Sequence, residues 1–286
     1  MRVLITGADG QLGKALQRTA PAQARITAVD VADMDITDRD SVEAGVTGCR
    51  PDIIFNAAAY TAVDKAEAEE ASAQAVNATA VGLLAAAAAK VGARLVHVST
   101  DFVFDGAAST PYGPDAEPHP LGAYGRTKLA GERAAGPEAL IVRTGWLYAP
   151  TGANFVRTML RLMAERPEVR VVADQIGTPT YAPGLASALW DLGGEQGLSG
   201  VYHYADAGVA SWYDFAVAIQ EEALLLGLLQ KPALVLPITT ADYPTPARRP
   251  HYSVLDTRKT WTALGRPAPH WRASLRTMLN ELKIHG

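Results

Sequence analysis

A tyrosine and a lysine four residues apart could carry out proton-transfer chemistry. Tyr124 and Lys128 share one face if residues 123–132 form a helix, because positions i and i+4 lie one turn apart. A free tyrosine has a pKa of about 10 and is a poor acid at neutral pH. A neighbouring ammonium group stabilises the phenolate and lowers that pKa. The pair can therefore give a proton to a carbonyl oxygen while a hydride reaches its carbon.

A hydroxyl group stands where such a reaction would need one. Thr100 follows the β-type run Arg94–Ser99, so we expect it at the carboxyl edge of a parallel sheet, where ligands bind in open α/β folds. Its hydroxyl could hydrogen-bond and orient a substrate carbonyl. The Tyr-x-x-x-Lys spacing often arises by chance, so this interpretation depends on the hydroxyl and a glycine loop preceding the pair.

The glycine loop lies at the start of the chain, between the strand-like Val3–Thr6 and a helix predicted over Gln11–Arg18. Its spacing is G-x-x-G-x-x-G. Glycines let a backbone turn tightly and approach a pyrophosphate, and a helix N-terminus offers free N–H groups. A loop without ligand is the alternative. The predicted cofactor-binding residues here are Gly7, Gly10, Gln11, Leu12 and Gly13.

Three later positions could complete a dinucleotide site. Asp30 ends the second strand, where a carboxylate can accept hydrogen bonds from the adenine ribose. A carboxylate there repels a 2′-phosphate, which favours NADH, although nearby arginines leave NADPH possible. Asp35 and Ile36 could flank the adenine, or form an unliganded turn. Small side chains after the third strand would let the backbone lie along the cofactor, or serve close packing: Ala57, Ala58 and Ala59.

The elements that must position these residues alternate in type. Uninterrupted apolar strands separated by helices are typical of a parallel sheet covered on both faces. The sequence therefore predicts a Rossmann-type, doubly wound α/β fold, with a long helical region over residues 66–89 as two helices or one bent helix. The predicted strands are Val3–Thr6, Arg25–Val29, Ile53–Asn56, Arg94–Ser99 and Ala139–Arg143.

The pattern weakens after residue 148. We expect residues 1–148 to form the NAD(P)-binding domain, with a later segment of about 181–202 returning to it, and residues 149–286 to form mainly a smaller substrate-binding domain. Stretches rich in proline or glycine predict loops at 107–121, 191–200 and 241–250.

Composition narrows the class of protein. The 286 residues are 48% hydrophobic and 20% charged, which suffices for a sizeable core. The net charge of −4 argues against nucleic-acid or anionic-membrane binding. One cysteine allows no intrachain disulfide, and the six histidines lack ligand spacing, so we expect no metal site. The first residues enter a strand directly, and the apolar run Ala80–Ala89 is too short for a bilayer. A soluble, cytoplasmic protein is expected.

Longer stretches carry a family resemblance. They include NAAAYTAVDKAE (56–67), HVSTDFVFDG (97–106), YGRTKLAGE (124–132), RTGWLY (143–148), DQIGTPT (174–180) and YPTPARRP (243–250). From residue 1 to about 275 the chain resembles the dTDP-4-dehydrorhamnose reductase family of extended short-chain dehydrogenases/reductases. DQIGTPT and YPTPA are the stretches most specific to that family.

The resemblance implies NADH- or NADPH-dependent reduction of the 4-keto group of dTDP-4-dehydro-L-rhamnose to dTDP-L-rhamnose. The implied catalytic residues are Thr100, Tyr124 and Lys128, with Tyr124 as proton donor. The implied contacts to the substrate's sugar are Thr61, Val63 and Trp146, and to its nucleotide Asn154, Phe155, Gln175, Thr180 and Arg249. Three of these positions have plainer interpretations: Trp146 as core, Phe155 as the apolar face of a helix, and Arg249 in an internal salt bridge.

Two departures from the family pattern matter. Phe102 stands where relatives often have tyrosine, so we leave it out of the predicted site. Some relatives are thought to dimerise through a magnesium ion held partly by a carboxylate on the first helix, and the stretch 13–17 has none, which favours a monomer over a dimer.

Three other functions remain open at this stage. They are a reductase of another dTDP-4-keto-deoxysugar, a non-catalytic regulatory subunit on the same fold, and an epimerase with a retained cofactor.

Overall fold

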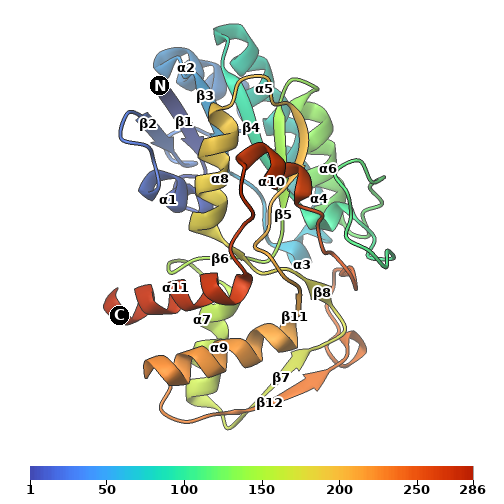
Figure 1. Cartoon of the computed structure of the whole chain (residues 1–286). Helices are drawn as coiled ribbons and strands as arrows, with labels where there is room; N and C mark the ends of the chain where they lie inside the picture. The colour runs from blue at the N-terminus through green and yellow to red at the C-terminus, as the bar shows by residue number, and fades with distance from the viewer. Residues whose placement is uncertain (286) are drawn as a thin grey trace.

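A six-stranded parallel sheet forms the centre of the upper lobe in Figure 1. This computed structural model describes residues 1–285. The strand order is β10-β5-β4-β3-β1-β2, so the winding direction reverses between β1 and β3, a position where α/β sheets bind ligands. The predicted doubly wound sheet is confirmed, with each predicted strand end correct to within one residue. The strands are β1 (Arg2–Thr6), β2 (Arg25–Val29), β3 (Ile53–Asn56), β4 (Arg94–Thr100), β5 (Leu140–Thr144) and β10 (Gly200–His203).

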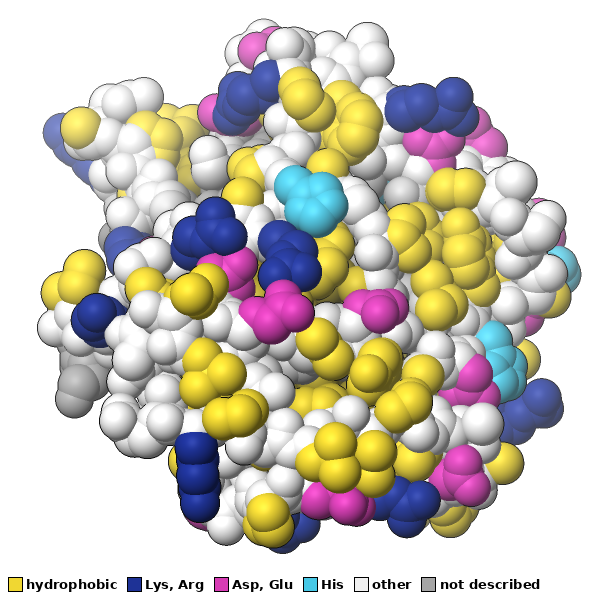
Figure 2. Space-filling model, turned by 60° about the horizontal axis from the view of Figure 1, so that its bottom comes forward, with side chains coloured by type: hydrophobic (Ala, Val, Ile, Leu, Met, Phe, Trp, Pro, Cys, Tyr) yellow, Lys and Arg dark blue, Asp and Glu magenta, His cyan; other side chains and the backbone are white. Residues whose placement is uncertain are grey.

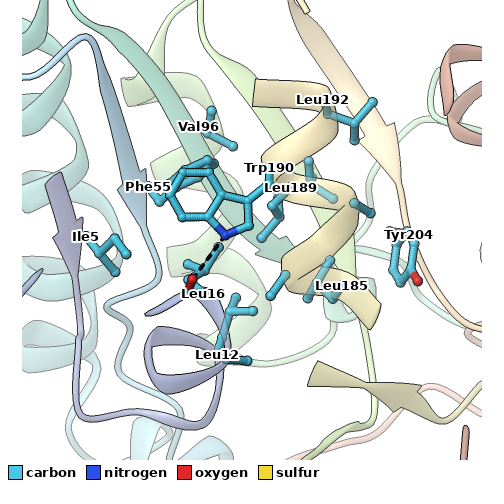
Figure 3. Close-up of a cluster of buried hydrophobic side chains, with 14 of the residues drawn as sticks. Ile5, Leu12, Leu16, Phe55, Val96, Leu185, Leu189, Trp190, Leu192 and Tyr204 are labelled. Atoms are coloured by element: carbon cyan, nitrogen blue, oxygen red, sulfur yellow. Dashed lines mark hydrogen bonds between the residues drawn. The ribbon is translucent and has the colours of Figure 1, made fainter. Parts of the chain in front are cut away.

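Helices cover both faces of this sheet because successive strand residues point to opposite sides. In β1, Val3 and Ile5 join one apolar cluster and Leu4 joins another. Figure 3 shows the first cluster, where the Trp190 indole donates a 3.0 Å hydrogen bond to the Leu16 carbonyl. The covering helices are α1 (Gln11–Arg18), α2 (Arg39–Cys49), α5 (Ala80–Val91), α6 (Ala123–Ala135), α8 (Ala182–Gly194) and α10 (Arg258–Leu264).

The predicted helical region over residues 66–89 contains one continuous helix with a π-helical turn. It runs through α4 (Glu70–Gln74), η1 (Ala75–Thr79) and α5. By length and hydropathy, 22 residues of it could cross a bilayer. Its inner side, however, is buried in the apolar cluster that contains Leu4, and Leu84 is fully buried there. Packing inside the fold therefore accounts for its apolar character.

One loop prediction is wrong in part. Residues 191–200 were expected to be a loop, but α8 continues through Gly194. The reason is tertiary packing. Leu192 is fully buried, and a Cβ atom added at Gly193 would lie 3.0 Å from the Phe55 ring, so this glycine lets the helix approach the sheet.

A second lobe lies below the sheet in Figure 1 and has its own core. Phe215, Ile219, Leu275 and Met278 are fully buried there. Its elements are β6 (Leu147–Tyr148), α7 (Phe155–Glu165), β7 (Glu168–Val172), β8 (Ile176–Gly177), β9 (Thr180–Tyr181), β11 (Ala210–Ser211), α9 (Trp212–Leu226), β12 (Leu234–Ile238), η3 (Thr240–Asp242) and α11 (Trp271–His285).

Three later elements belong to the first lobe. α8 packs into the sheet's apolar cluster, β10 pairs with β5, and α10 lies against β10, where Thr260 donates a hydrogen bond to the His203 carbonyl. The return of α10 was not anticipated from the sequence. We propose that the chain up to the end of β5, with α8, β10 and α10, forms the cofactor-binding unit, and that the second lobe forms most of the substrate-binding unit. The boundary expected at residue 148 then falls slightly earlier, because Tyr148 of β6 is buried in the second lobe's core.

Candidate active site

The glycine loop lies at the point where the sheet reverses. Gly7 has a φ of 68°, and a Cβ atom there would come within 2.7 Å of the Ala58 backbone. Gly10 is the N-cap of α1 and carries no capping side chain, which leaves N–H groups of the first turn available. A loop this close to residues 57–58, next to an uncapped helix N-terminus, fits the pyrophosphate of a dinucleotide.

Asp30 contacts the same loop. Its Oδ2 accepts a 3.0 Å hydrogen bond from the Asp9 amide, and its Oδ1 accepts one from Val31. Asp35 is exposed, and hydrogen bonds from both the hydroxyl and the amide of Thr37 lower its pKa. Asp30 thus stands at the loop as predicted, and Asp35 close to it along the chain.

Three predicted cofactor residues have side chains engaged elsewhere. Leu12 and Ile36 are buried in apolar clusters, so only their backbone can face a cofactor. Gln11 accepts a 2.9 Å hydrogen bond from Asn154 of the second lobe, and its amide reaches the Ala153 carbonyl. Ala57, Ala58 and Ala59 are half-buried beside the loop.

A buried polar chain crosses the strand ends beneath this site. The Thr6 hydroxyl donates to Asn56 Oδ1 at 2.8 Å, and Asn56 Nδ2 lies 3.1 Å from His97 Nδ1. Burial, assisted by the charge of Lys128, holds the pKa of His97 well below its usual value. The imidazole is therefore neutral, and the chain ties β1, β3 and β4 together.

The three predicted catalytic side chains come from β4 and α6. Thr100 is the last residue of β4; its Oγ1 accepts a hydrogen bond from the Phe102 amide and donates one to Asp101. Tyr124 lies in the first turn of α6, as its second residue, and its ring packs edge-on against Phe102, with centroids 5.6 Å apart. Burial raises the pKa of Tyr124 to about 12; the Thr100 hydroxyl beside it acts in the opposite direction, and the Asp101 charge adds to the rise.

The prediction that Lys128 and the positive nicotinamide together lower the pKa of Tyr124 concerns the protein with its cofactor bound. In the protein alone, burial has the largest effect on this pKa. The Lys128 ammonium instead donates a 2.7 Å hydrogen bond to the Val98 carbonyl and is itself buried. Burial lowers the pKa of Lys128 to about 8, against the opposing charge of Glu132. Tyr124 therefore keeps its proton at neutral pH, as a proton donor must.

A cavity of about 770 Å³ lies in the second lobe, and its described lining does not include Thr100, Tyr124 or Lys128. Three predicted substrate residues line it: Phe155, Gln175 and Arg249. Helix α3 (Val63–Ala66) connects it to the catalytic set. Asp64 of α3 lines the cavity, and Glu67, just after α3, accepts a 2.8 Å hydrogen bond from the Ala123 amide next to Tyr124.

Arg249 makes the internal salt bridge that was its plainer interpretation. Its Nη2 lies 2.7 Å from Asp64 Oδ2, with the arginine side chain 26% exposed. Both residues line the cavity, so the guanidinium is held at its wall and keeps further N–H donors for a ligand.

Other predicted substrate residues do not line this cavity. Thr180 is fully buried in β9, where its hydroxyl reaches only the Thr178 carbonyl, so its side chain is structural. Asn154 caps α7 through Oδ1, and its amide bonds Gln11, which leaves it little capacity for a nucleotide. Thr61 is exposed and Val63 half-buried at the start of α3.

The aromatic predictions have mixed outcomes. Phe155 begins α7 and packs on Phe215, which agrees with the alternative that it forms the apolar face of a helix. It also lines the cavity. Trp146 is half-buried, but its ring is stacked on Trp212, so one face of the indole is covered.

Four residues around the site were not predicted. Asp64 and Trp212 line the cavity, as does the 59%-exposed Tyr243, while Phe102 packs on Tyr124. The sequence did contain a signal for Asp64, because this residue follows the predicted Val63 and belongs to the family-like stretch 56–67. Trp212 had none, since its partner lies 66 residues earlier in the sequence.

Charges of both signs are interspersed on the face of the molecule drawn in Figure 2. With a net charge of −4, the overall field does not attract an anionic ligand. A nucleotide sugar must therefore be held by individually placed groups such as Arg249.

Comparison with known proteins agrees with this geometry. The family model described as "RmlD substrate binding domain" matches residues 1–284. The dTDP-4-dehydrorhamnose reductase of Aggregatibacter actinomycetemcomitans is 44% identical, covering 97% of this chain and 98% of that protein. The crystal structure of a Clostridium acetobutylicum dTDP-4-dehydrorhamnose reductase has a TM-score of 0.92 at 40% identity, covering 99% of this chain and 100% of that one.

A further solved structure bears on the cofactor. The Bacillus anthracis dTDP-4-dehydrorhamnose reductase, crystallised in complex with NADP, has a TM-score of 0.92 at 40% identity, covering 98% and 99% of the two chains. A glycine loop against a strand end, a Thr–Tyr–Lys set and a near full-length match to relatives thus agree: this chain belongs to the dTDP-4-dehydrorhamnose reductase family.

Proposed function

We propose that the protein reduces the 4-keto group of dTDP-4-dehydro-L-rhamnose to dTDP-L-rhamnose with NADPH or NADH. The observation that carries this is the placement of the half-buried Tyr124 next to Thr100, at the strand edge that also holds the glycine loop. Relatives named for this reaction match nearly the whole chain.

The residues divide the work between them. The glycine loop would hold the nicotinamide cofactor, which when bound would supply the hydride. Thr100 hydrogen-bonds the ketone oxygen and orients it, and Tyr124 gives that oxygen its proton as the carbonyl carbon is reduced. Lys128, positively charged below its pKa of about 8, stabilises the phenolate left on Tyr124. Low exposure of Thr100 and Lys128 keeps the local dielectric low, which strengthens these interactions.

Arg249 and Gln175 are proposed to hold the nucleotide end. A guanidinium presents several N–H donors in a plane, which suits a diphosphate. Gln175 is buried at the cavity wall, where its amide nitrogen donates to Thr240 and leaves its carbonyl oxygen for a ligand. Thr61 and Val63, at the start of α3, are proposed to border the sugar. Thr180 is not proposed again, because its side chain is enclosed.

A coupled assay tests the function. A dTDP-4-keto-6-deoxy sugar is generated in situ, and oxidation of NADH and NADPH is followed in parallel reactions. Turnover with either cofactor supports the proposal. No turnover with an intact, cofactor-binding protein would overturn it and favour a regulatory subunit.

The stereochemistry of the product separates this reaction from reduction of another dTDP-4-keto sugar. Nuclear magnetic resonance of the isolated product is expected to give the L-rhamno configuration. A different configuration at C4 would assign the protein to another deoxysugar.

We also propose that the protein works in the cytoplasm as a monomer. The stretch 13–17 on α1 offers no carboxylate for a metal-bridged contact. Light scattering after gel filtration is expected to give the mass of one 30.2 kDa chain, with or without added magnesium. A mass twice as large would contradict this.

A further inference from the structure

Trp146 has an unusual backbone conformation. It lies between β5 and β6 with a φ of 50°, and Arg50 is the other non-glycine residue with positive φ in the part of the chain that the structure describes. Bulky side chains rarely adopt the left-handed region, and residues that do are held there by their surroundings and cluster at ligand sites. Something must therefore hold Trp146 in place.

Trp212 provides that support. The two indole rings are stacked with centroids 3.5 Å apart and planes inclined by 5°. Gly177 approaches the same indole, since a Cβ atom there would lie 2.6 Å from Trp146 Cε2. Both supports come from one small sheet, because Gly177 pairs with Ala210 of β11 and α9 begins at Trp212 immediately after that strand.

The start of α9 is itself fixed. A capping box joins Ser211 and Asp214: the Asp214 amide donates to the Ser211 hydroxyl at 3.0 Å, and the Ser211 amide donates to the Asp214 carboxylate at 2.9 Å. This cap restricts the first turn, so Trp212 offers Trp146 a rigid surface.

The stacked pair of Trp146 and Trp212 lies between the end of β4, which carries Thr100, and the cavity. Gly145, which precedes Trp146, lies against the Asp101 carboxylate, since a Cβ atom there would be 2.6 Å from it. Trp212 lines the cavity together with Phe155, whose ring centroid is 4.7 Å away. A Cβ atom at Gly177 would also lie 2.7 Å from Trp146 Nε1, so Gly177 packs beside the indole nitrogen, while Trp212 covers one face of the ring.

We propose that Trp212 is a positioning residue for substrate binding. It holds the strained Trp146 so that the part of this indole left uncovered by Trp212 and Gly177 meets the sugar of the bound nucleotide. This inference rests on the proposed function, because it assumes that Trp146 meets the substrate. Misplacing a group that orients a substrate weakens binding and turnover even when the chemical groups remain intact.

The first experiment replaces the stacking partner. Trp212→Leu is expected to raise KM for the dTDP-4-keto sugar by roughly tenfold, leaving KM for the nicotinamide cofactor unchanged. Trp212→Phe keeps an aromatic surface and is expected to retain a KM within about twofold of the wild-type value, which also guards against a folding defect in the leucine variant. Equal KM values for the wild type and Trp212→Leu would overturn the proposal.

A spectroscopic readout follows the stack directly. Closely stacked indoles couple their electronic transitions and give a paired circular-dichroism signal, which Trp212→Leu and Trp146→Leu should both abolish. Trp261→Phe is the matched control, because Trp261 lies on α10 and does not line the cavity. Loss of the signal in the control alone would mean that the stack does not form in solution.

The double variant decides between positioning and direct contact. If Trp212 acts through Trp146, then Trp146→Leu/Trp212→Leu has the same KM as Trp146→Leu alone. Independent, multiplying effects would overturn the positioning role. Wild-type protein with the paired signal but without any turnover would instead refute the proposed function, so the two failures are distinguishable.

Discussion

At the scale of single residues, burial decides the chemistry of the site. Tyr124 and Lys128 both shift toward their uncharged forms, the first to a pKa of about 12 and the second to about 8. A neutral tyrosine retains the proton that a reduction needs. The lysine charge is proposed to stabilise the phenolate at neutral pH once the proton has left.

Tyr124→Phe removes the proposed proton donor and keeps the ring that packs on Phe102. Loss of a general acid is expected to lower kcat by roughly 10²- to 10⁴-fold. Binding of NADH, measured by fluorescence titration, should be unchanged. Near-normal turnover of this variant would show that another group donates the proton.

Asp101 makes the stability of the fold depend on pH. Burial raises the pKa of Asp101 to about 6, opposed by hydrogen bonds from Ser253 and Thr100. The folded state then binds this proton more tightly than the unfolded state, whose carboxyl has a pKa of about 3.9, so stability falls as pH rises between the two values.

Asp101→Asn cannot lose a proton and removes that dependence. Between pH 4 and 7, the free energy of unfolding of the wild type is expected to fall by roughly 2–3 kcal/mol relative to the variant. Urea unfolding at a series of pH values measures the difference. A constant difference across that range would show that Asp101 titrates normally.

At the scale of elements, the catalytic helix α6 takes its N-terminal cap from a distant segment. Its N-cap residue, Gly122, has no side chain that could cap the helix. The Glu67 carboxylate instead accepts a hydrogen bond from the Ala123 amide. An acceptor at this point satisfies a free N–H and favours the positive end of the helix dipole. The segment after α3 thereby fixes the turn that carries Tyr124.

Glu67→Ala is expected to lower the free energy of unfolding by about 1 kcal/mol and to reduce kcat, because the uncapped turn holds Tyr124 less firmly. Glu67→Gln keeps an acceptor and should recover most of both. The matched control is Glu70→Ala. It removes an exposed ion pair between Glu70 of α4 and Arg126 of α6. Such pairs contribute little, so equal effects of Glu67→Ala and Glu70→Ala would contradict the capping role.

At the scale of the whole molecule, the site lies where the two lobes meet. Gln11 of the glycine loop is tied to Asn154 of α7, and Asp64 of α3 is tied to Arg249, 185 residues later. These contacts join the proposed cofactor-binding unit to segments that line the cavity of the second lobe. The orientation of the two bound reactants therefore depends on the packing of one lobe against the other.

Arg249→Ala tests whether this contact also serves the substrate. Loss of a charge-assisted diphosphate contact is expected to raise KM for the nucleotide sugar by roughly 10- to 100-fold and to weaken the salt dependence of kcat/KM. The control is Arg248→Ala, which removes the same charge from an exposed neighbour. If both variants kept the wild-type KM, Arg249 would be only a structural partner of Asp64.

Local patterns in the chain were sufficient for the first five strands of the sheet, the glycine loop and the order of Thr100, Tyr124 and Lys128, but not for the sixth strand, β10. Periodicity and short spacings depend on neighbours along the sequence, which the sequence shows directly. Family resemblance added the residues of the substrate site, but not whether their side chains are free to bind.

Tertiary packing decided that last question. Thr180 is enclosed, Asn154 is used as a cap, Arg249 is paired with Asp64, and Trp146 has one face covered by Trp212. Each outcome depends on a partner side chain or on burial that no local spacing reveals. The pKa of Tyr124 follows the same rule, because desolvation is a property of the assembled fold and outweighs the effect expected from a lysine one turn away.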